Sequence, residues 1–430
     1  MKIAVIQFSS GSVINGVGYI MGSLIDHGHD VSFYNINTTF KNNFTNKCKN
    51  IKDFYFIILN IVNIKFDIIF LSCLSMDVQI AYKLAHMIKL IRNVPIVMGG
   101  VHPTIVKEQI LIECQDIDYI CIGEGEEFVI DVVNKLHCKD FNTIKNLGYR
   151  DNNTICINPI REPQNLENLP NFPFYLYHKK YLVDQNGFAF IKATRGCPYS
   201  CTFCCNSIFL KLYPGKYLRT RPIDNVISDI RILIKYNPKL ICFSDEMLLT
   251  NKVYASELFK RIKTDINIPF GFMARVEYLS HDIIKLASDC GCKYIGIGIE
   301  CGDEDFRKKF LNRNMSNDQI IKSFKMCHDN NIYTTSFNMI GYPVTNDNDL
   351  TESTIKLNDL IKPGYVQIAI FHPFPGTPLY EYCLEHDLID ANKMKASISC
   401  YDDSVLKNTS LIQKRNEMSS YFNTKPFYLE

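Results

Sequence analysis

Short apolar runs alternate with helical patterns in two separate stretches of this 430-residue chain. The first stretch extends from Met1 to about Leu136 and the second begins at Phe188. Such alternation is typical of parallel sheets, because a chain must cross over, usually as a helix, before it can add another parallel strand. The sequence therefore predicts two α/β domains in succession.

In the first stretch the pattern predicts a doubly wound, parallel, five-stranded sheet of the flavodoxin-like kind, with strands at 3–8, 30–34, 66–72, 95–99 and 119–122. Ligands of such sheets bind beyond the carboxyl ends of the strands. Glycine at these ends lets the backbone approach a large ligand. His102 has an alternative role, because it could simply begin a helix before Pro103. The candidate ligand-binding residues at these ends are Ser72, Cys73, Leu74, Ser75, Gly99, Gly100, His102, Gly123, Glu124 and Gly125.

The second stretch predicts a partial (β/α)6 barrel of the TIM type, with strands at 188–194, 240–244, 270–275, 294–300, 333–340 and 365–371. Six strand and helix units are too few to close an eight-stranded barrel, so we expect an open form. The predicted division is an α/β domain at 1–145, a hairpin and Pro-rich linker at 146–182, the partial barrel at 183–382 and a helical tail at 383–430.

Cys197, Cys201 and Cys204 follow the first strand of this barrel. Three thiolates at this spacing can hold three irons of a four-iron cluster and leave the fourth iron open to a ligand. A structural zinc site would need a fourth ligand, and the adjacent Cys205 is awkwardly placed to supply it. Seventeen scattered cysteines without a signal peptide also argue against a disulfide framework and favour a reduced, cytoplasmic chain.

The spacing Cys-x3-Cys-x2-Cys, with an aromatic residue before the last cysteine, resembles the signature of the radical S-adenosylmethionine (SAM) enzymes. In that family the open iron binds SAM, and one electron from the cluster cleaves SAM to a 5'-deoxyadenosyl radical. Taken alone, Asp245 and Glu246 could cap a helix, and Arg275 could be the partner in an ion pair. By resemblance, the SAM-binding residues are Phe203, Asp245, Glu246, Arg275, Glu300 and Ile340.

The first domain makes the resemblance more specific. A sheet that ends in Gly-Gly-x-His-Pro-Thr and Gly-Glu-Gly-Glu, and is joined by a hairpin to the cysteine triplet, looks like that of the cobalamin-dependent radical SAM family over about residues 1–380. The resemblance implies that a corrinoid binds across the carboxyl edge of this sheet, facing the barrel. Residues 9–18 lack the Asp-x-His-x-x-Gly of other cobalamin proteins, so we expect no protein imidazole on cobalt.

Other cofactor classes fit less well. The glycines between Gly11 and Gly16 lack the Gly-x-Gly-x-x-Gly spacing of a dinucleotide site, and there is no Walker lysine. The five cysteines up to residue 138 lack the spacing that a second cluster of the methylthiotransferase kind would need.

Charge and hydropathy restrict the partners. The net charge is only +2, with 47 basic and 45 acidic residues, which disfavours nucleic acid. Polar residues interrupt the most apolar stretch, Phe54 to Leu71, so we expect no membrane span. A small-molecule or peptide substrate is favoured. The resemblance also implies an electron donor such as flavodoxin or ferredoxin.

The leading hypothesis is an enzyme with a [4Fe–4S] cluster, SAM and cobalamin that methylates an unactivated carbon. The second is an oxidative cyclase or rearrangement enzyme of the same architecture. The third, from another class, is a non-catalytic corrinoid or cluster sensor, which would not need the series of barrel strand-end motifs.

Overall fold

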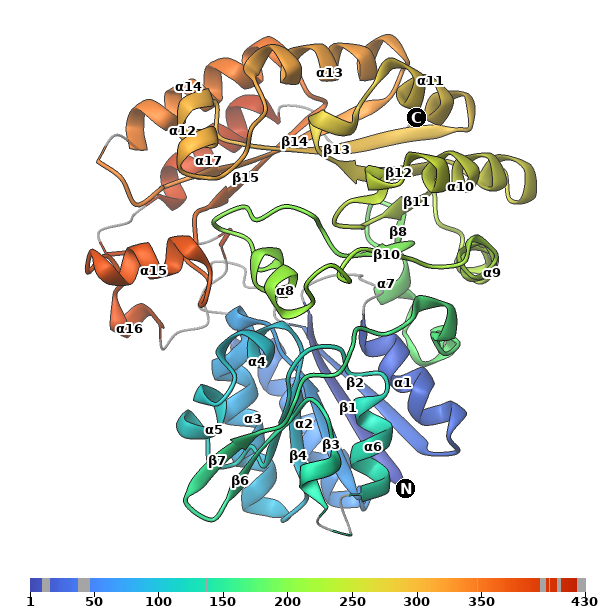
Figure 1. Cartoon of the computed structure of the whole chain (residues 1–430), viewed down its shortest axis with the longest axis vertical. Helices are drawn as coiled ribbons and strands as arrows, with labels where there is room; N and C mark the ends of the chain where they lie inside the picture. The colour runs from blue at the N-terminus through green and yellow to red at the C-terminus, as the bar shows by residue number, and fades with distance from the viewer. Residues whose placement is uncertain are drawn as a thin grey trace. The chain divides into compact units, whose positions relative to one another are not determined.

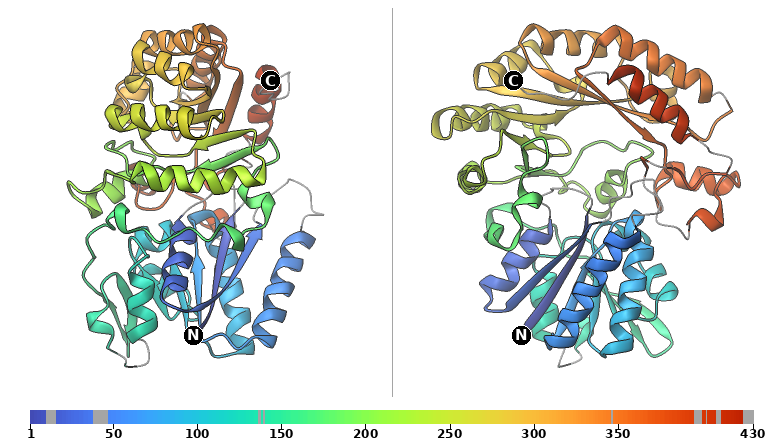
Figure 2. Two further views of the ribbon diagram at one scale, coloured as in Figure 1. Left: turned by 90° about the vertical axis from the view of Figure 1, so that its right-hand side faces the viewer. Right: turned by 180° about the vertical axis from the view of Figure 1, so that it is seen from behind.

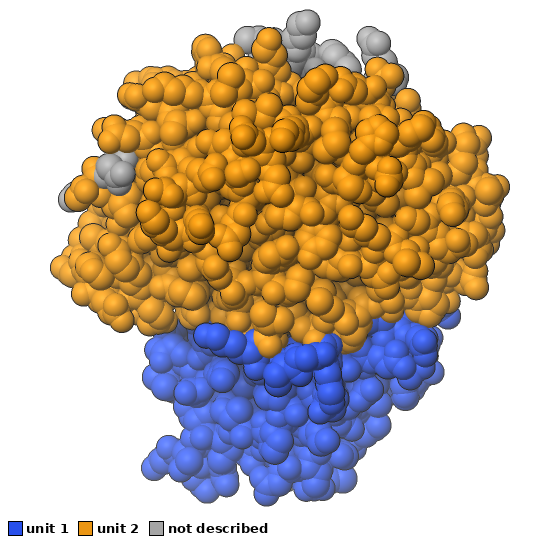
Figure 3. Space-filling model, turned by 45° about the horizontal axis from the view of Figure 1, so that its top comes forward, with its two compact units in different colours: residues 1–181, 211–216, 395–397 blue, residues 182–210, 217–394, 398–430 orange. Residues whose placement is uncertain are grey.

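The computed structural model describes residues 1–9, 16–37, 47–135, 138, 140–345, 347–394, 400–401, 403–407 and 411–423. The chain forms two compact units, drawn in different colours in Figure 3. Unit 1 contains Met1–Tyr181 and the short segment Lys211–Lys216. Unit 2 contains Leu182–Leu210 and the chain from Tyr217 to the C-terminal helix.

Unit 1 is built on a seven-stranded sheet of order β2-β1-β3-β4-β5-β6-β7. The first five strands are parallel and have the flavodoxin-like order, as predicted. The expected hairpin forms but is more than a connection, because β6 pairs antiparallel with β5 and so extends the sheet. The strands are β1 Lys2–Ser9, β2 Asp30–Asn37, β3 Ile68–Ser72, β4 Ile96–Gly99, β5 Tyr119–Cys121, β6 Leu147–Asp151 and β7 Thr154–Ile157.

Helices cover both faces of this sheet (Figures 1 and 2). One face carries the larger apolar core, in which Ile57 and Leu84 of two helices pack with Ile6 and Leu71 of the strands. Burial on both faces explains why the central strands read as nearly continuous apolar runs. The helices are α1 Gly16–Asp26, α2 Lys47–Asn63, α3 Val78–Ile91, α4 Val101–Val106, α5 Gln109–Glu113, α6 Phe128–Lys135 and α7 Lys179–Leu182.

Unit 2 is built on six parallel strands of order β15-β14-β13-β12-β11-β8, which leaves β8 and β15 at the two edges of an open, curled sheet. All six strands lie where the sequence predicts them. The first predicted strand is shorter than expected, because Thr194 and Arg195 leave it and pair antiparallel with another segment. The strands are β8 Phe188–Ile191, β9 Thr194–Arg195, β10 Arg219–Thr220, β11 Leu240–Phe243, β12 Phe270–Ala274, β13 Cys292–Glu300, β14 Tyr333–Ile340 and β15 Tyr365–Ile370.

The crossover helices α10, α11, α13 and α14 lie along the outer face of the curled sheet (Figure 1). Local sequence signals mark the start of two helices of unit 2. Ser316 and Gln319 form a capping box at α13, and Thr377 caps α15 before Pro378. The helices of unit 2 are α8 Asn206–Leu212, α9 Ile223–Leu233, α10 Lys252–Asp265, α11 His281–Asp289, α12 Glu304–Lys309, α13 Asn317–Asp329, α14 Asp347–Ile361, α15 Pro378–Glu385, α16 Ala391–Met394 and α17 Ile412–Phe422.

The helical tail covers the open edge of β15. Met418 of α17 packs with Val366 and Ile368 of that strand. The Asn423 side chain accepts from the Val366 amide at 2.9 Å and donates to the Val366 carbonyl at 2.9 Å. These contacts satisfy the amide and carbonyl of Val366 and help to cover an edge that could otherwise pair with another chain.

Candidate active site

The three cysteines lie on one loop between β9 and α8. Cys197 and Cys201 are buried and Cys204 is partly buried. The loop begins at Gly196, whose φ of +101° is open to glycine, and a Cβ there would lie 2.3 Å from the Tyr217 carbonyl oxygen. No other residue fits this position without a shift of the backbone.

Distant parts of unit 2 hold the middle of the loop. Thr202 donates from its hydroxyl to the Phe310 carbonyl at 2.7 Å and from its amide to the Leu311 carbonyl at 3.3 Å. Its own carbonyl accepts from the Leu379 amide at 3.0 Å, in the first turn of α15. The conformation of the cysteine loop therefore depends on hydrogen bonds to two distant segments, at 310–311 and at the start of α15.

The thiols differ in their surroundings. Burial raises the pKa of Cys197 to about 11, whereas a hydrogen bond from Cys205 lowers the pKa of Cys204. Among the described residues, no three His, Cys, Asp or Glu side chains converge on a point where one metal ion could bind. A four-iron cluster needs no such convergence, since each thiolate binds a different iron. The cysteine set thus fits a cluster better than a zinc ion.

The acidic pair after β11 divides into two roles. Asp245 is buried and accepts from the Ala193 amide at 3.0 Å and from the amide and hydroxyl of Thr194, so it shapes the backbone that leads to the cysteine loop. Burial raises its pKa to about 6. Glu246 pairs with Lys192 through one oxygen, and its other oxygen, Oε2, is buried without a hydrogen-bond partner. An amino group is the kind of donor that this oxygen lacks.

Glu300 ends β13 in a left-handed conformation, with a φ of +70°, at an irregularity in the pairing with β14. Its carboxylate lies 3.4 Å from Arg313, which also donates to the Gly298 carbonyl at 2.6 Å. Burial raises the pKa of Glu300, and this effect exceeds the lowering by the positive charges of Arg313 and Arg275. A strained residue supported by neighbouring side chains is often found at a functional site.

The other three predicted SAM-binding residues, Arg275, Phe203 and Ile340, lie in different surroundings. Arg275 follows the last residue of β12 and directs its guanidinium at Cys201, with Nη1 3.2 Å from Sγ. Phe203 packs partly buried beside Leu311 in an apolar cluster. Ile340 is buried with Val366, so its side chain belongs to the core and only its backbone and the following turn remain for a ligand.

In unit 1 the predicted residues after β3 and β4 come together. The Cys73 amide donates to the Gly99 carbonyl at 2.9 Å, and the His102 amide donates to the Cys73 carbonyl at 3.3 Å. Nδ1 of His102 lies 2.9 Å from the Ser75 hydroxyl, and burial lowers the pKa of this imidazole to about 4. Gly100 has a φ of +108°, and a Cβ there would lie 2.7 Å from the Cys73 carbonyl oxygen. Ser72 is the register partner of Gly99.

The loop after β5 joins this group. The Gly123 amide donates to the Thr104 hydroxyl at 2.9 Å, and that hydroxyl donates to the Gly100 carbonyl at 2.8 Å. Gly123 has a φ of +92°, and a Cβ there would lie 2.2 Å from the hydroxyl of Tyr213. The same hydroxyl accepts from the Glu124 amide at 3.0 Å. All three predicted strand ends are therefore connected.

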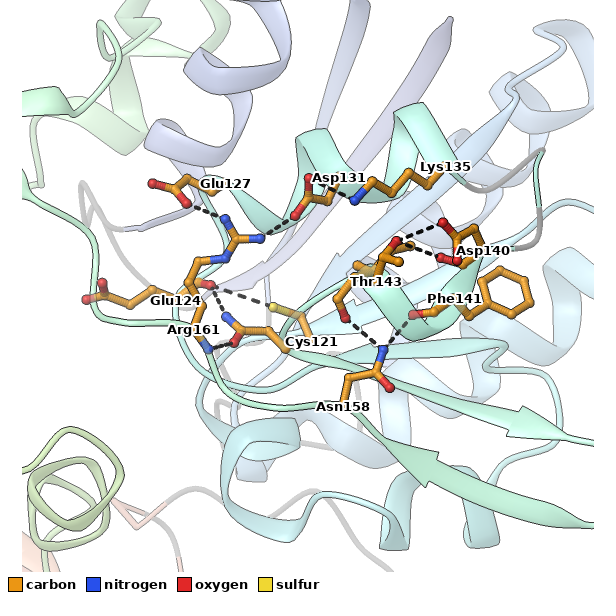
Figure 4. Close-up of polar contacts among 12 residues, drawn as sticks. Cys121, Glu124, Glu127, Asp131, Lys135, Asp140, Phe141, Thr143, Asn158 and Arg161 are labelled. Atoms are coloured by element: carbon orange, nitrogen blue, oxygen red, sulfur yellow. Dashed lines mark hydrogen bonds and ion pairs between the residues drawn. The ribbon is translucent and has the colours of Figure 1, made fainter.

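Arg161 and Gln164, which follow the β6–β7 hairpin, form hydrogen bonds with residues 124–131, after β5; Figure 4 shows those of Arg161. Arg161 donates to the carboxylates of Glu127, the residue before α6, and Asp131 of α6. The Gln164 amide donates to Oε2 of Glu124 at 2.6 Å. Both the side chain and the backbone of Glu124 are thus engaged within the protein, because its carbonyl also accepts from the Asn146 side chain at 2.9 Å.

The carboxyl edge of this sheet carries small residues and one exposed apolar side chain. Leu74 is 44% exposed at the end of β3, and the neighbouring strand ends carry glycine. At Gly125 a Cβ would meet Ile20 at 3.1 Å, so a side chain there would crowd α1. The loop after β1 falls at 10–15, outside the described residues, where the absence of a histidine rests on the sequence alone.

Sequence reasoning missed four residues of these sites, namely Lys192, Tyr213, Glu277 and Arg313. Glu277 stands two residues after Arg275, so an acidic partner close to the predicted arginine was the only available signal. Arg313 lies between two helices rather than at a strand end, and Tyr213 contacts Glu124 across 89 residues of sequence. No local pattern reveals such contacts.

Comparison with known proteins agrees with this geometry. The model of the B12 binding domain family matches residues 2–133, and that of the Radical SAM superfamily matches residues 191–354. An uncharacterized methyltransferase of Pyrococcus horikoshii is 30% identical over 330 residues, which make up 75% of this chain and 70% of that protein. The chain belongs to the cobalamin-dependent radical SAM family. The predicted family and fold class are confirmed.

Two further proteins bear on this radical SAM enzyme. The anaerobic magnesium-protoporphyrin IX monomethyl ester cyclase of Rubrivivax gelatinosus is 24% identical over 297 residues, 66% of this chain but only 52% of the cyclase. The radical SAM methyltransferase TsrM from Kitasatospora setae, solved with cobalamin and a [4Fe–4S] cluster bound, has a TM-score of 0.68 at 13% identity and covers 90% of this chain and 75% of its own. At this identity the likeness shows the fold.

Family membership gives this radical SAM enzyme its cofactors, a [4Fe–4S] cluster, SAM and cobalamin. The loop cysteines and the unpartnered oxygen of Glu246 fit the first two, and the glycine-rich sheet edge fits the third. No helix among the described residues has the length and apolar character needed to span a bilayer.

Proposed function

We propose that this chain is a cobalamin-dependent methyltransferase that acts on an unactivated carbon of a small molecule or peptide. The observation that carries the proposal is the union of a B12 binding domain and a radical SAM domain in one chain whose P. horikoshii relative is described as a methyltransferase. When bound, the cluster and SAM supply a 5'-deoxyadenosyl radical, and cobalamin supplies a methyl carrier.

The chain's own residues bind and orient these groups. Cys197, Cys201 and Cys204 each hold one iron, and the loop contacts described above keep their spacing. Glu246 accepts from the amino group of SAM through its unpartnered oxygen, which satisfies a buried acceptor. Glu300, held by Arg313, accepts from a hydroxyl of the SAM ribose.

In unit 1 the corrinoid lies over the connected ends of β3, β4 and β5. The residues that line it are Ser72, Cys73, Leu74, Ser75, Gly99, Gly100, His102, Gly123, Glu124 and Gly125. His102 stays neutral at pH 7 and is held by Ser75, so it contributes shape and a hydrogen bond rather than charge. A reduced flavodoxin or ferredoxin of the cytoplasm supplies the electrons.

A second candidate is an oxidative cyclase of the same architecture, favoured by the similarity to the R. gelatinosus cyclase. Both candidates need the cluster and SAM, and both use the same residues of unit 2. They differ in whether a methyl group leaves SAM as a cation equivalent, which yields S-adenosylhomocysteine, or whether SAM is only cleaved to 5'-deoxyadenosine.

The test needs no knowledge of the substrate. Reconstituted protein is incubated anaerobically with SAM and titanium(III) citrate, with and without hydroxocobalamin, and both nucleoside products are measured by mass spectrometry. A methyltransferase gives S-adenosylhomocysteine only when hydroxocobalamin is present. Formation of 5'-deoxyadenosine without S-adenosylhomocysteine under both conditions would replace the first candidate by the second.

The matched control is Cys197→Ala/Cys201→Ala/Cys204→Ala, in which the cluster ligands are lost but unit 1 is unchanged. This variant should form no 5'-deoxyadenosine and should still bind hydroxocobalamin. With a candidate substrate in hand, deuteromethyl-labelled SAM should place the label on a carbon of the product.

A further inference from the structure

The guanidinium of Arg275 contacts the cysteine loop at two points. Its Nη1 lies 3.2 Å from Sγ of Cys201, the middle cysteine of the triplet. Its central carbon lies 3.7 Å from the centre of the Tyr199 ring, within the same loop. The arginine is 6% exposed, so these contacts are made away from bulk water, where a charge acts strongly on its neighbours.

Glu277 fixes the direction of this guanidinium. Its Oε1 accepts from Nη2 of Arg275 at 2.5 Å and from Nε at 3.2 Å. This side-on pairing leaves Nη1 as the nitrogen directed at the sulfur. Tyr199 is held in turn, since its hydroxyl donates to the hydroxyl of Tyr278 at 3.3 Å. The group lies entirely within unit 2.

We infer that Arg275 is a positioning residue of the cluster, one that donates a hydrogen bond to the Cys201 ligand sulfur and raises the reduction potential of the cluster. The inference rests on the proposed ligation of the cluster by Cys197, Cys201 and Cys204. Reduction adds one electron from an external one-electron reductant, breaks no bond, and makes the cluster more negative. A buried positive charge and an N–H donor at a ligand sulfur both stabilise that added charge.

This role differs from the contact with the SAM carboxylate that the family resemblance implies for Arg275. A carboxylate ligand would matter only when SAM is bound, whereas the contact of Arg275 with Cys201 joins two groups of the protein itself. Measurements without SAM therefore separate the two roles. Glu277 provides a second, opposite perturbation, because its removal leaves the charge of Arg275 uncompensated.

The experiment uses the full chain, reconstituted anaerobically and without SAM. Iron content is measured first, and the cluster is then titrated with titanium(III) citrate while the reduced form is followed by EPR. In Arg275→Met the ratio of reduced to oxidised cluster at the wild-type midpoint should fall at least tenfold, a shift of about 59 mV to more negative potential for a one-electron couple. In Glu277→Gln the same ratio should rise.

Arg275→Lys keeps the charge but loses the planar fork, so its shift should lie between those of the wild type and Arg275→Met. The matched control is Lys325→Met, which removes an exposed cation paired with Asp329 in the same unit and should leave the midpoint unchanged.

The outcomes separate the two levels of the argument. Lack of iron in the wild-type protein would refute the proposed ligation itself. Full iron content with an unchanged midpoint in Arg275→Met would overturn the role of the arginine while leaving the ligation intact. If Arg275→Met does not retain iron, Glu277→Gln decides: a rise in the reduced fraction supports the role, and no rise overturns it.

Discussion

The two units hold their strand ends by different physical means. In unit 2 the ends of β12 and β13 carry buried charged pairs, Arg275 with Glu277 and Glu300 with Arg313. Buried charges are costly unless they are paired in good geometry, so each such pair fixes the direction of its side chains. The ligands proposed for this unit, a cluster and the charged methionine part of SAM, are themselves charged.

In unit 1 neutral groups connect the ends of β3, β4 and β5, whereas the charged pairs of Arg161 with Glu127 and Asp131 lie where the chain enters α6. Glycine at 100 and 123 allows backbone segments to touch, the Thr104 hydroxyl bridges two of them, and His102 is kept uncharged by burial. Such an edge recognises shape rather than charge, which suits a corrinoid. We therefore expect the chemistry of each strand-end edge to match the charge of the ligand proposed for it. The predictions below test it.

The largest effect is expected at the cysteine loop. Cys201→Ala should lose most of the bound iron, because each thiolate holds one iron and the residue also contacts Arg275. Iron analysis after anaerobic reconstitution, with Cys205→Ala as the matched control, checks this. Binding of hydroxocobalamin should not change, and its loss would mean that the two units do not act separately.

The second effect concerns acid stability of unit 1. Burial lowers the pKa of His102 from its ordinary 6.5 to about 4, so below pH 6.5 the unfolded chain takes up a proton that the folded chain does not. Stability should therefore fall as the pH drops from about 6.5 to 4. At 1.36 kcal/mol per pKa unit, this residue accounts for about 3 kcal/mol.

Urea unfolding of the wild type and of His102→Gln, followed by circular dichroism at pH 7, 6, 5 and 4, measures this term. The difference between the two proteins should shrink or reverse toward pH 4. Parallel stability curves would show that the imidazole has the same pKa in the folded and the unfolded chain, and the evidence for a neutral edge would fail.

The third effect tests shape at the corrinoid edge. Gly123→Ala should weaken retention of hydroxocobalamin about tenfold, because the new Cβ would lie 2.2 Å from the Tyr213 hydroxyl in a left-handed backbone. Iron content should be unaffected. Gly16→Ala, where a Cβ meets no atom of the described residues within 4 Å, is the matched control for equilibrium dialysis. Equal retention in both variants would contradict a close-fitting edge.

The smallest effect lies far from both ligand edges. Asn423→Ala removes two hydrogen bonds to Val366 at the edge of β15 and should destabilise unit 2 by about 1–2 kcal/mol. Thermal unfolding checks the value, and Asn416→Ala, on the same helix, serves as the reference. A decrease in cobalamin retention would not be expected, since the change affects unit 2 alone.

Much of this protein could be predicted from local patterns. Every parallel strand of both sheets lies where the sequence predicts it, because buried strands are rich in apolar and β-branched residues over a short stretch. The cysteine triplet and the strand ends with glycine or acidic residues were equally visible. The hairpin was visible too, but not its pairing with β5, which depends on an edge that only the folded sheet presents.

The sequence alone determined the two α/β units, the family and the cysteines that can hold a cluster, since each depends on residues close together in the chain. The tertiary structure decided which groups those residues meet. Arg275 reaches Cys201 across 74 positions and Tyr213 reaches Glu124 across 89. Contacts at such separation depend on how crossover helices and loops pack, and no local periodicity encodes them. For this reason Asp245 supports the backbone beside the cysteine loop, and Arg275 contacts a thiol of that loop.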